Sequence, residues 1–247
     1  MALALICIGF VTVMWDIRLR ISYSCYGRED FRRFNRVQQK GLRTLIAIVK
    51  IYADFRVIVE KAIAGKLPRQ FMVLSNHQSL ADIPVLAYVF SPRIVGFVAK
   101  SELARGLPSF SFALRKGKHA LISRRGEFSS AHKELIKLAK YSREDVCPTV
   151  FPEGTRSRTG RVGSFHSAAV RTILNKVSMP VLSVALDGGL RIARIRGLLT
   201  NLRNCRYRVK FLSLYPPTND RAEIRDIVRK SHEEISRQVK LWRSNQK

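Results

Sequence analysis

The stretch SNHQSLADIP, Ser75 to Pro84, lies between two apolar runs, FMVL (71–74) and VLAYVF (85–90). It places two titratable side chains, His77 and Asp82, between segments whose composition favours burial. The first run is typical of a buried strand and the second of a helix. The residues directly after the strand are therefore expected to form a strand-to-helix loop. Polar loops at strand ends carry the chemistry of many α/β proteins. The stretch therefore predicts both an α/β arrangement and a candidate site.

Short apolar runs and helical patterns alternate along the rest of the chain, without an internal repeat or a low-complexity linker. Besides FMVL, the expected strands are RVIVE (56–60), IVGFVA (94–99), ALIS (120–123), PTVF (148–151), VLSVAL (181–186) and YRVKFLSLY (207–215). Helices are expected over 79–90, 108–117, 127–141, 167–176 and 220–242. The alternation predicts one α/β domain over residues 61–247, with a mixed central sheet flanked by helices, preceded by an N-terminal segment over 1–60.

The N-terminal segment begins with an apolar run from Ala2 to Met14. As a helix this run reaches about 21 Å, which is short of the roughly 30 Å hydrocarbon core of a bilayer. No basic residue precedes the run, which argues against a signal peptide. We expect a short anchor or a membrane-dipping helix, with a tilted spanning helix and a core helix as alternatives.

A second helix is expected over residues 31–55. Its apolar side chains fall near one stripe, and its basic side chains include Arg32, Arg33, Arg36, Lys40 and Arg43. A basic, amphipathic helix beside an apolar terminus suits the surface of an anionic bilayer. The alternative is a helix packed on the core with a solvated basic face. On the first interpretation, residues 1–60 form a membrane-associating segment.

The charge and the cysteines limit the classes of partner and site. The chain has 45 Lys and Arg against 18 Asp and Glu, a net charge of +27, which favours nucleic acid, an anionic membrane or a phosphorylated substrate. No nucleic-acid-binding motif accompanies the charge, so nucleic acid is not expected. The four cysteines form no CxxC pair, which predicts reduced thiols on a cytosolic face. The histidines lack metal-ligand spacing, so no metal is expected.

His77 and Asp82 cannot share one face of a helix, because residues five apart are rotated by roughly 140°. We expect His77 in the loop, Ser79 as the N-cap and Asp82 in the first helical turn, so that Ser79 and Asp82 form a capping box. The carboxylate of Asp82 would reach either the Ser79 amide or the His77 ring. In the second case it would fix the tautomer of the ring and make His77 a general base. Spacing alone favours a simple cap.

A second polar loop follows the strand expected at 148–151. FPEGTRSRTG (151–160) combines a glycine, which lets backbone amides approach a ligand, with hydroxyls and with arginines that bind phosphate through a planar fork. The loop is neither a P-loop nor a dinucleotide fingerprint. It indicates a phosphate site.

The two loops together resemble the glycerolipid acyltransferase family, whose best-known members are the 1-acylglycerol-3-phosphate acyltransferases. The family's HxxxxD motif corresponds to His77 and Asp82, and its EGTRS motif to residues 153–157. Other matching segments are LISR (121–124), PVLSVALDG (180–188) and FVAKSEL (97–103), so that the resemblance covers about residues 71–188. The chain departs from the usual pattern at Ser123, often aspartate in the family, and at Ser183, often proline. After EGTRS the usual FK-x-G is also replaced by FHSA (165–168).

The resemblance implies acyl transfer from acyl coenzyme A or acyl carrier protein to a lysophospholipid, at the cytoplasmic face of a membrane and without a cofactor. It implies that His77 is the base and that Asp82 orients it. The implied acceptor-site residues are Lys100, Arg124, Glu153, Gly154, Thr155, Arg156 and Ser157. Arg124 and Arg156 would hold the phosphate, and Glu153 would bind a donor group or brace an arginine. Lysophosphatidate is the expected acceptor; glycerol 3-phosphate, another lysophospholipid or a lyso-aminolipid are alternatives, and a non-catalytic lipid-binding relative is a remote one.

Overall fold

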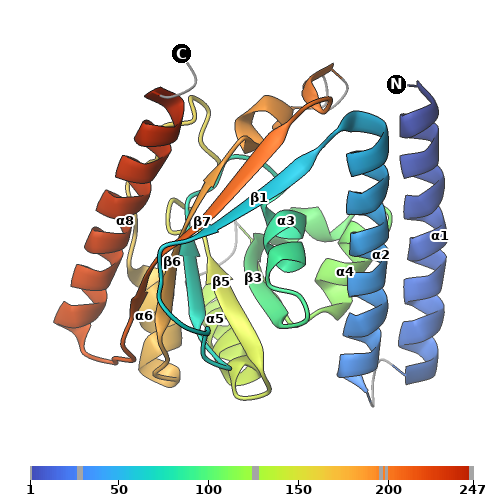
Figure 1. The fold of residues 1–247 in the computed structure, drawn as a ribbon. Coiled ribbons are helices and arrows are strands. Elements are labelled where there is room, and N and C mark those ends of the chain that lie inside the picture. The colour runs from blue at the N-terminus through green and yellow to red at the C-terminus, as the bar shows by residue number, and fades with distance from the viewer. Residues whose placement is uncertain (1, 27–29, 124–127, 195–196, 198–199, 245–247) are drawn as a thin grey trace.

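The strands form one mixed sheet in the computed structural model, which describes residues 2–26, 30–123, 128–194, 197 and 200–244 (Figure 1). The described residues contribute seven strands, in the order β1-β7-β6-β2-β5-β3-β4. Their bounds are β1 Arg56–Lys61, β2 Met72–Ser75, β3 Ile94–Lys100, β4 Ala120–Ile122, β5 Val146–Val150, β6 Val181–Asp187 and β7 Arg206–Tyr215. All neighbouring pairs are parallel except β6 and β7, which are antiparallel. The predicted mixed sheet is confirmed.

The three central strands, β2, β5 and β6, are buried along their whole length. Alternate side chains of β2 enter different cores: Val73 packs in one apolar cluster, while Met72 and Leu74 pack in another. Strands that are covered on both faces read as continuous apolar runs. This is why they could be predicted from FMVL, PTVF and VLSVAL.

Helices cover both faces of the sheet (Figure 1). The bounds are α1 Ala2–Tyr26, α2 Phe31–Ala53, α3 Asp82–Val89, α4 Phe110–Lys116, α5 Phe128–Ser142, α6 Ala168–Lys176 and α8 Arg221–Ser244, with 3-10 turns η1 Ser101–Ala104 and η2 Gly189–Ile192. On one face, α2 and α3 contribute Val49 and Leu86 to the cluster that contains Val73. On the other face, α5 and α6 contribute Leu138 and Ile173 to the cluster that contains Leu74 and part of α8. Because both faces of the sheet are packed against helices, its strands provide a fixed support for the loops that leave their ends.

The first two helices lie side by side at one end of the molecule (Figure 1). α1 continues as a regular helix past Arg18 and Arg20, well beyond the apolar run that predicted it. Near its end, Leu19 packs with Phe34 of α2 and Phe112 of α4. Among the residues that the structure describes, no helix combines the length and the apolar character needed to cross a membrane.

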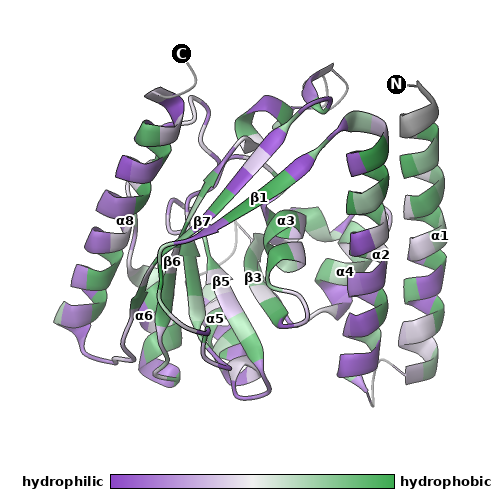
Figure 2. Ribbon diagram, viewed as in Figure 1, coloured by the Kyte–Doolittle hydropathy of each residue, from purple (hydrophilic) through white to green (hydrophobic). Residues whose placement is uncertain are grey.

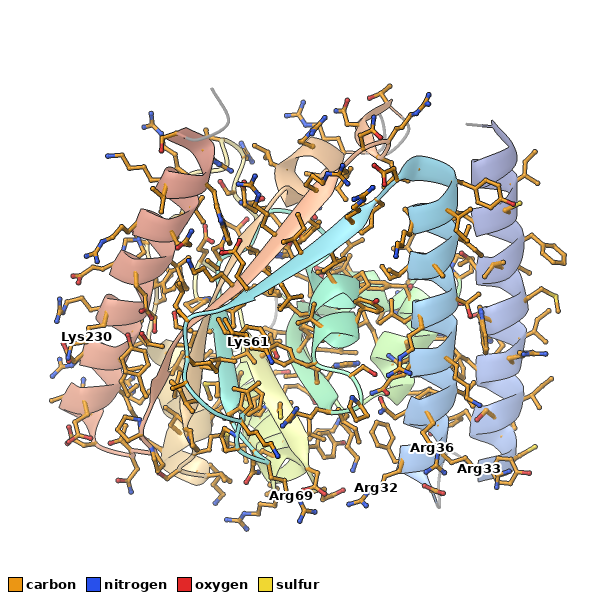
Figure 3. All side chains as sticks on the ribbon, viewed as in Figure 1. Arg32, Arg33, Arg36, Lys61, Arg69 and Lys230 are labelled. Carbon is orange, nitrogen blue, oxygen red and sulfur yellow. The ribbon has the colours of Figure 1, made fainter. Side chains whose placement is uncertain are left out.

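Much of the apolar side of α2 faces the protein, although Ile51 and Tyr52 near its end are exposed. Phe34 and Val49 are buried, whereas the basic side chains at the start of the helix point outward. Figure 3 shows Arg32, Arg33 and Arg36 together at that end, near Arg69. The structure thus matches the core-packed alternative for this helix, because α2 lies between α1 and the domain.

A stripe of exposed apolar side chains lies on α1 instead. Most of its members are three or four residues apart, so they share one broad face of the helix; they are Ile6, Phe10, Val13, Met14, Ile17 and Ile21. Figure 2 shows the hydrophobic character of α1 along the outer side of the molecule. We call this set the α1 stripe.

Candidate active site

Four segments with polar side chains leave the same edge of the sheet. β2, β5, β6 and β3 run parallel to one another, so their carboxyl ends lie together. The segments that follow them are residues 76–81 (the histidine loop), residues 151–167 (the EGTRS loop), η2, and the Lys100 end of β3. Ligands of open α/β sheets bind at this edge. The sheet thus brings together motifs that are distant in the sequence.

His77 and Asp82 form a pair in the histidine loop. The His77 Nδ1 atom lies 2.6 Å from Oδ2 of Asp82. An ionised carboxylate can only accept a hydrogen bond, so Nδ1 of His77 is the donor in this contact. The side chain of His77 is 15% exposed and that of Asp82 is fully buried, and no described residue is hydrogen-bonded to Nε2. In the neutral tautomer that makes this bond, Nε2 is the nitrogen that is able to accept a proton.

Backbone amides hold the Asp82 carboxylate in place. Oδ2 accepts hydrogen bonds from the amides of Gln78, at 2.6 Å, and Ser79, at 3.0 Å. α3 begins at Asp82 with Ala81 in the N-cap position, so Ser79 is not the N-cap that the sequence predicted. The Ser79 hydroxyl instead accepts from the Ala81 amide. The carboxylate contacts both the Ser79 amide and the His77 ring, which the sequence treated as alternatives.

A buried tyrosine supplies a further donor to Asp82. The hydroxyl of Tyr207 donates to Oδ1 of Asp82, and Tyr207 is fully buried. Burial, and then the charge of Asp82, raise the pKa of Tyr207 well above its ordinary value, so the hydroxyl keeps its proton. β7 is antiparallel to β6 and therefore starts at the same edge of the sheet. The sequence carried no signal for this contact beyond an aromatic residue in an expected strand.

Glu153 connects the two loops. Its Oε1 accepts from the His77 amide and its Oε2 from the Gly163 amide, each at 2.8 Å. The Ser157 amide donates to the His77 carbonyl, also at 2.8 Å. Burial raises the pKa of Glu153, and the two amides oppose part of that rise. Among the described residues the hydrogen-bond partners of this carboxylate are backbone amides, so Glu153 braces the two loops against each other.

The His77 ring also packs against the start of the EGTRS loop. It stacks on Phe151, with ring centroids 4.1 Å apart and planes inclined by 12°. Phe151 is in turn stacked beside Phe97 of β3. The stack and the bond from Asp82 fix the orientation of the imidazole from two sides.

A polar cavity of about 740 Å³ lies beside the histidine loop. Of the predicted acceptor-site residues, Lys100, Thr155, Arg156 and Ser157 line it, together with Gln78. Glu153 and Gly154 do not. Gly154 has a φ of +65°, and a Cβ there would meet no atom within 4 Å, so the backbone conformation rather than crowding explains the glycine. Arg124 lies outside the described residues.

An apolar cavity of about 200 Å³ lies among the N-terminal helices, α3 and α4. Its walls include Trp15, Leu45, Ala87, Phe97 and Phe110. A wall of this kind suits a hydrocarbon group and disfavours a phosphate. Phe97 links this cavity to the ring stack of His77. Among the described residues, no cluster of three or more His, Cys, Asp or Glu side chains is arranged to hold a metal ion.

Comparisons with known proteins identify one family. A sequence model of the family described as Acyltransferase matches residues 58–187. A 1-acyl-sn-glycerol-3-phosphate acyltransferase of Pseudomonas aeruginosa is 30% identical over 191 residues, which cover 72% of this chain and 71% of that protein. The protein of the same name from Helicobacter pylori is 28% identical over 188 residues, 76% of each chain. Among solved structures, the 1-acyl-sn-glycerophosphate (LPA) acyltransferase of Thermotoga maritima has a TM-score of 0.63 and 23% identity. That match covers 97% of this chain and 98% of the other, and indicates a shared fold.

Proposed function

Because the chain belongs to the Acyltransferase family, we propose that it transfers a fatty acyl group to the sn-2 hydroxyl of 1-acylglycerol 3-phosphate, forming phosphatidate. The donor is a thioester, acyl coenzyme A or acyl carrier protein. The observation that carries the proposal is the His77–Asp82 pair in a loop whose next residue, Gln78, lines a cationic cavity. The pair suits proton transfer from an alcohol, and the cavity suits a phosphate.

The proposed reaction requires one base and no covalent acyl-enzyme. The acceptor hydroxyl loses its proton to Nε2 of His77 as its oxygen attacks the thioester carbonyl. The new C–O bond forms, the C–S bond breaks, and the proton passes from His77 to the departing sulfur. Asp82 holds the ring and stabilises the imidazolium in between.

We assign the acceptor phosphate to the arginine end of the EGTRS loop. Arg156 is exposed to the cavity, next to the Ser157 amide that is bonded to the His77 carbonyl. The sn-3 phosphate and the sn-2 hydroxyl of the acceptor are on neighbouring carbon atoms, so the group that binds the phosphate must be close to the base. The hydrogen bond between Ser157 and His77 holds the arginine end of the EGTRS loop beside the histidine loop. Lys100 and Thr155 line the same cavity. Glu153 acts by bracing the two loops.

Replacing Arg156 with alanine is expected to raise the KM for 1-acylglycerol 3-phosphate by about tenfold to a hundredfold, as the loss of one charge-assisted hydrogen bond implies. The same substitution should leave the rate with monoacylglycerol, which has no phosphate, nearly unchanged. Initial rates with both acceptors measure the difference. Arg161→Ala is the matched control, since Arg161 is exposed on the same loop and does not line the cavity.

This assay also tests the proposed function. The account expects wild-type protein to prefer 1-acylglycerol 3-phosphate over monoacylglycerol, glycerol 3-phosphate and a lysophospholipid with a larger headgroup. An equal loss of activity toward monoacylglycerol in Arg156→Ala would contradict the assignment of Arg156 to the phosphate. A preference for an acceptor without a phosphate monoester would contradict the proposed substrate.

We further propose that the N-terminal helices place the site at a membrane surface, by way of the α1 stripe. A lysolipid acceptor resides in a bilayer, and an apolar helical face with basic residues nearby binds an anionic interface. Residues 1–60 are then the membrane-associating part of the chain and residues 61–247 the catalytic part.

Serine at both Phe10 and Ile17 is expected to weaken binding to phosphatidylglycerol vesicles by at least about tenfold, because two apolar side chains lose their burial. Co-sedimentation with vesicles measures the effect. A Leu241→Ser and Ile58→Ser double variant is the control, since both residues are exposed apolar side chains away from α1. Equal vesicle binding by the two double variants would contradict the proposal that the α1 stripe contacts the membrane.

A further inference from the structure

The short turn η2 is fastened directly against the His77–Asp82 pair. Gly188 precedes it with a φ of +97°, and a Cβ there would lie 2.3 Å from the carbonyl oxygen of Arg206. A Cβ on Gly189 would lie within 3.0 Å of the Tyr207 hydroxyl, Asp82 Oδ1 and Ser79 Oγ. Two glycines therefore allow η2 to start in contact with the catalytic pair.

Gln78 ties η2 to the histidine loop from the other side. Its Oε1 accepts from the Leu190 amide at 3.2 Å, and its Nε2 donates to the Leu186 carbonyl at 3.0 Å. Gln78 also lines the polar cavity. The hydrogen bond between Gln78 and Leu190 therefore fixes both the position of η2 relative to His77 and the face that η2 presents to the cavity.

Two arginines line that cavity from η2 and from the second residue beyond its end. Arg191 and Arg194 are exposed and line the cavity with Arg156 and Arg158 of the EGTRS loop. None of the four guanidinium groups forms an ion pair with a described residue, and none of the described lining residues is acidic. Four like charges around one cavity repel one another, and a polyanion relieves this repulsion.

Asp187, the acidic residue at the end of β6, is paired with another arginine and not with Arg191 or Arg194. Asp187, two residues before η2, is 3.1 Å from the guanidinium of Arg243 on α8 and 3.1 Å from the Gln78 amide nitrogen. Elsewhere in the described chain arginines share acids: Arg32 and Arg69 both contact Asp145. The η2 arginines are thus left for a ligand.

The acceptor brings one phosphate, and the proposed function already assigns it to Arg156. A cavity of about 740 Å³ is large enough for a second anionic group on the η2 side. The reaction needs a second substrate whose thioester must reach His77. Both kinds of donor attach the acyl chain to phosphopantetheine: coenzyme A carries two further phosphate groups, and carrier protein has a single phosphodiester.

Resting on the proposed function, we propose that Arg191 and Arg194 form a second anion subsite that binds the phosphates of the phosphopantetheine donor. The two substrates then bind on opposite sides of the cavity. Arg156 binds the acceptor phosphate on the EGTRS-loop side, and Arg191 and Arg194 bind the donor phosphates on the η2 side. Gln78 belongs to the histidine loop and is hydrogen-bonded to η2, so it fixes the position of η2 relative to His77. A donor whose phosphates are bound by η2 therefore has its thioester positioned relative to the base.

The test is the Arg191→Gln/Arg194→Gln double variant. Its KM for acyl coenzyme A should rise about tenfold to a hundredfold, the loss expected for two charge-assisted contacts, with a much smaller change in the KM for the acceptor. The matched control is Arg203→Gln/Arg221→Gln, which removes the same charge at exposed positions that do not line the cavity. The control should keep the wild-type KM for the donor.

Donor variants distinguish the two sources of phosphate. If coenzyme A is the donor, acyl dephospho-coenzyme A should lose affinity in wild type, and the double variant should be nearly indifferent to the missing phosphate. If acyl carrier protein is the donor, the double variant should raise its KM instead. A rise in acceptor KM with an unchanged donor KM, for whichever donor supports turnover, would overturn the proposal.

A binding measurement separates this proposal from the proposed function. Titration calorimetry with coenzyme A, and with phosphopantetheinylated carrier protein, requires no acceptor and no turnover. Binding by wild type that is lost in the double variant supports the η2 subsite even if lysophosphatidate is not acylated. Equal binding by both proteins, or no binding of either ligand by wild type, overturns the subsite even if lysophosphatidate is acylated.

Discussion

Replacing His77 with alanine is expected to lower the kcat of acyl transfer by about 10³-fold, because general-base catalysis contributes on that order. The imidazole is the group whose Nε2 faces no described partner while its Nδ1 is held by Asp82. Without it, the acceptor hydroxyl must lose its proton to water. Steady-state rates with 1-acylglycerol 3-phosphate and an acyl thioester measure the loss.

The fold is expected to survive this substitution. The histidine loop keeps its anchors at Asn76 and Gln78, both of which bond the Leu186 backbone. His166→Ala is the matched control, since His166 is exposed on the EGTRS loop and should retain the wild-type kcat. Added imidazole should restore part of the activity of His77→Ala only. A wild-type kcat in His77→Ala would reduce the His77–Asp82 pair to a structural contact within the histidine loop.

Replacing Asp82 with asparagine is expected to lower kcat by about 10²- to 10³-fold while preserving the loop. Three donors surround the Oδ2 position, so the asparagine oxygen must take it and still accept from Nδ1 of His77. The asparagine nitrogen then faces the hydroxyls of Ser79 and Tyr207, which are able to accept. The shape and the tautomer are kept, and the charge that stabilises the imidazolium is lost.

Tyr207→Phe gives the graded comparison for Asp82→Asn. It removes one donor and leaves the carboxylate and its amide donors, so we expect a loss in kcat of about tenfold or less. Rapid kinetics of a single turnover measure the chemical step in both variants. Asp82→Asn with no greater loss than Tyr207→Phe would contradict a role for the Asp82 charge in catalysis.

The central sheet was predictable because its strands are buried on both faces. Runs such as FMVL and VLSVAL contain no polar alternation to confuse them with surface strands, and both lie where the structure has β2 and β6. The order of the strands was not predictable. It depends on crossover connections and on the antiparallel return of β7, which no local pattern specifies.

The candidate base was predictable as a motif, whereas its supports were not. His77 and Asp82 stand out as titratable residues between apolar runs, but their spacing fits a cap equally well. The distinction depends on Glu153, whose partners are the backbone amides of His77 and Gly163 and therefore leave no side-chain signature. It also depends on Tyr207, which reaches Asp82 only through the β6–β7 pairing.

The start of α3 and the face of α2 show how specific contacts override sequence patterns. Ser79 looked like an N-cap, yet Asp82 takes the amides of Gln78 and Ser79 in a loop before the helix begins. The second helix had the pattern of a membrane-surface helix, yet α1 covers it and carries the exposed apolar stripe itself. The first difference comes from a carboxylate three residues along the chain, and the second from packing against the preceding helix.

The most direct test of the central claim is the position of the acyl chain in the product. Wild-type protein in lipid vesicles would be given 1-acylglycerol 3-phosphate and an isotopically labelled acyl thioester, and the product cleaved by a phospholipase specific for the sn-2 ester. The account predicts labelled phosphatidate whose label is released entirely as fatty acid. Label that stays with the lysolipid after cleavage, or that is recovered in a lipid other than phosphatidate, would contradict it.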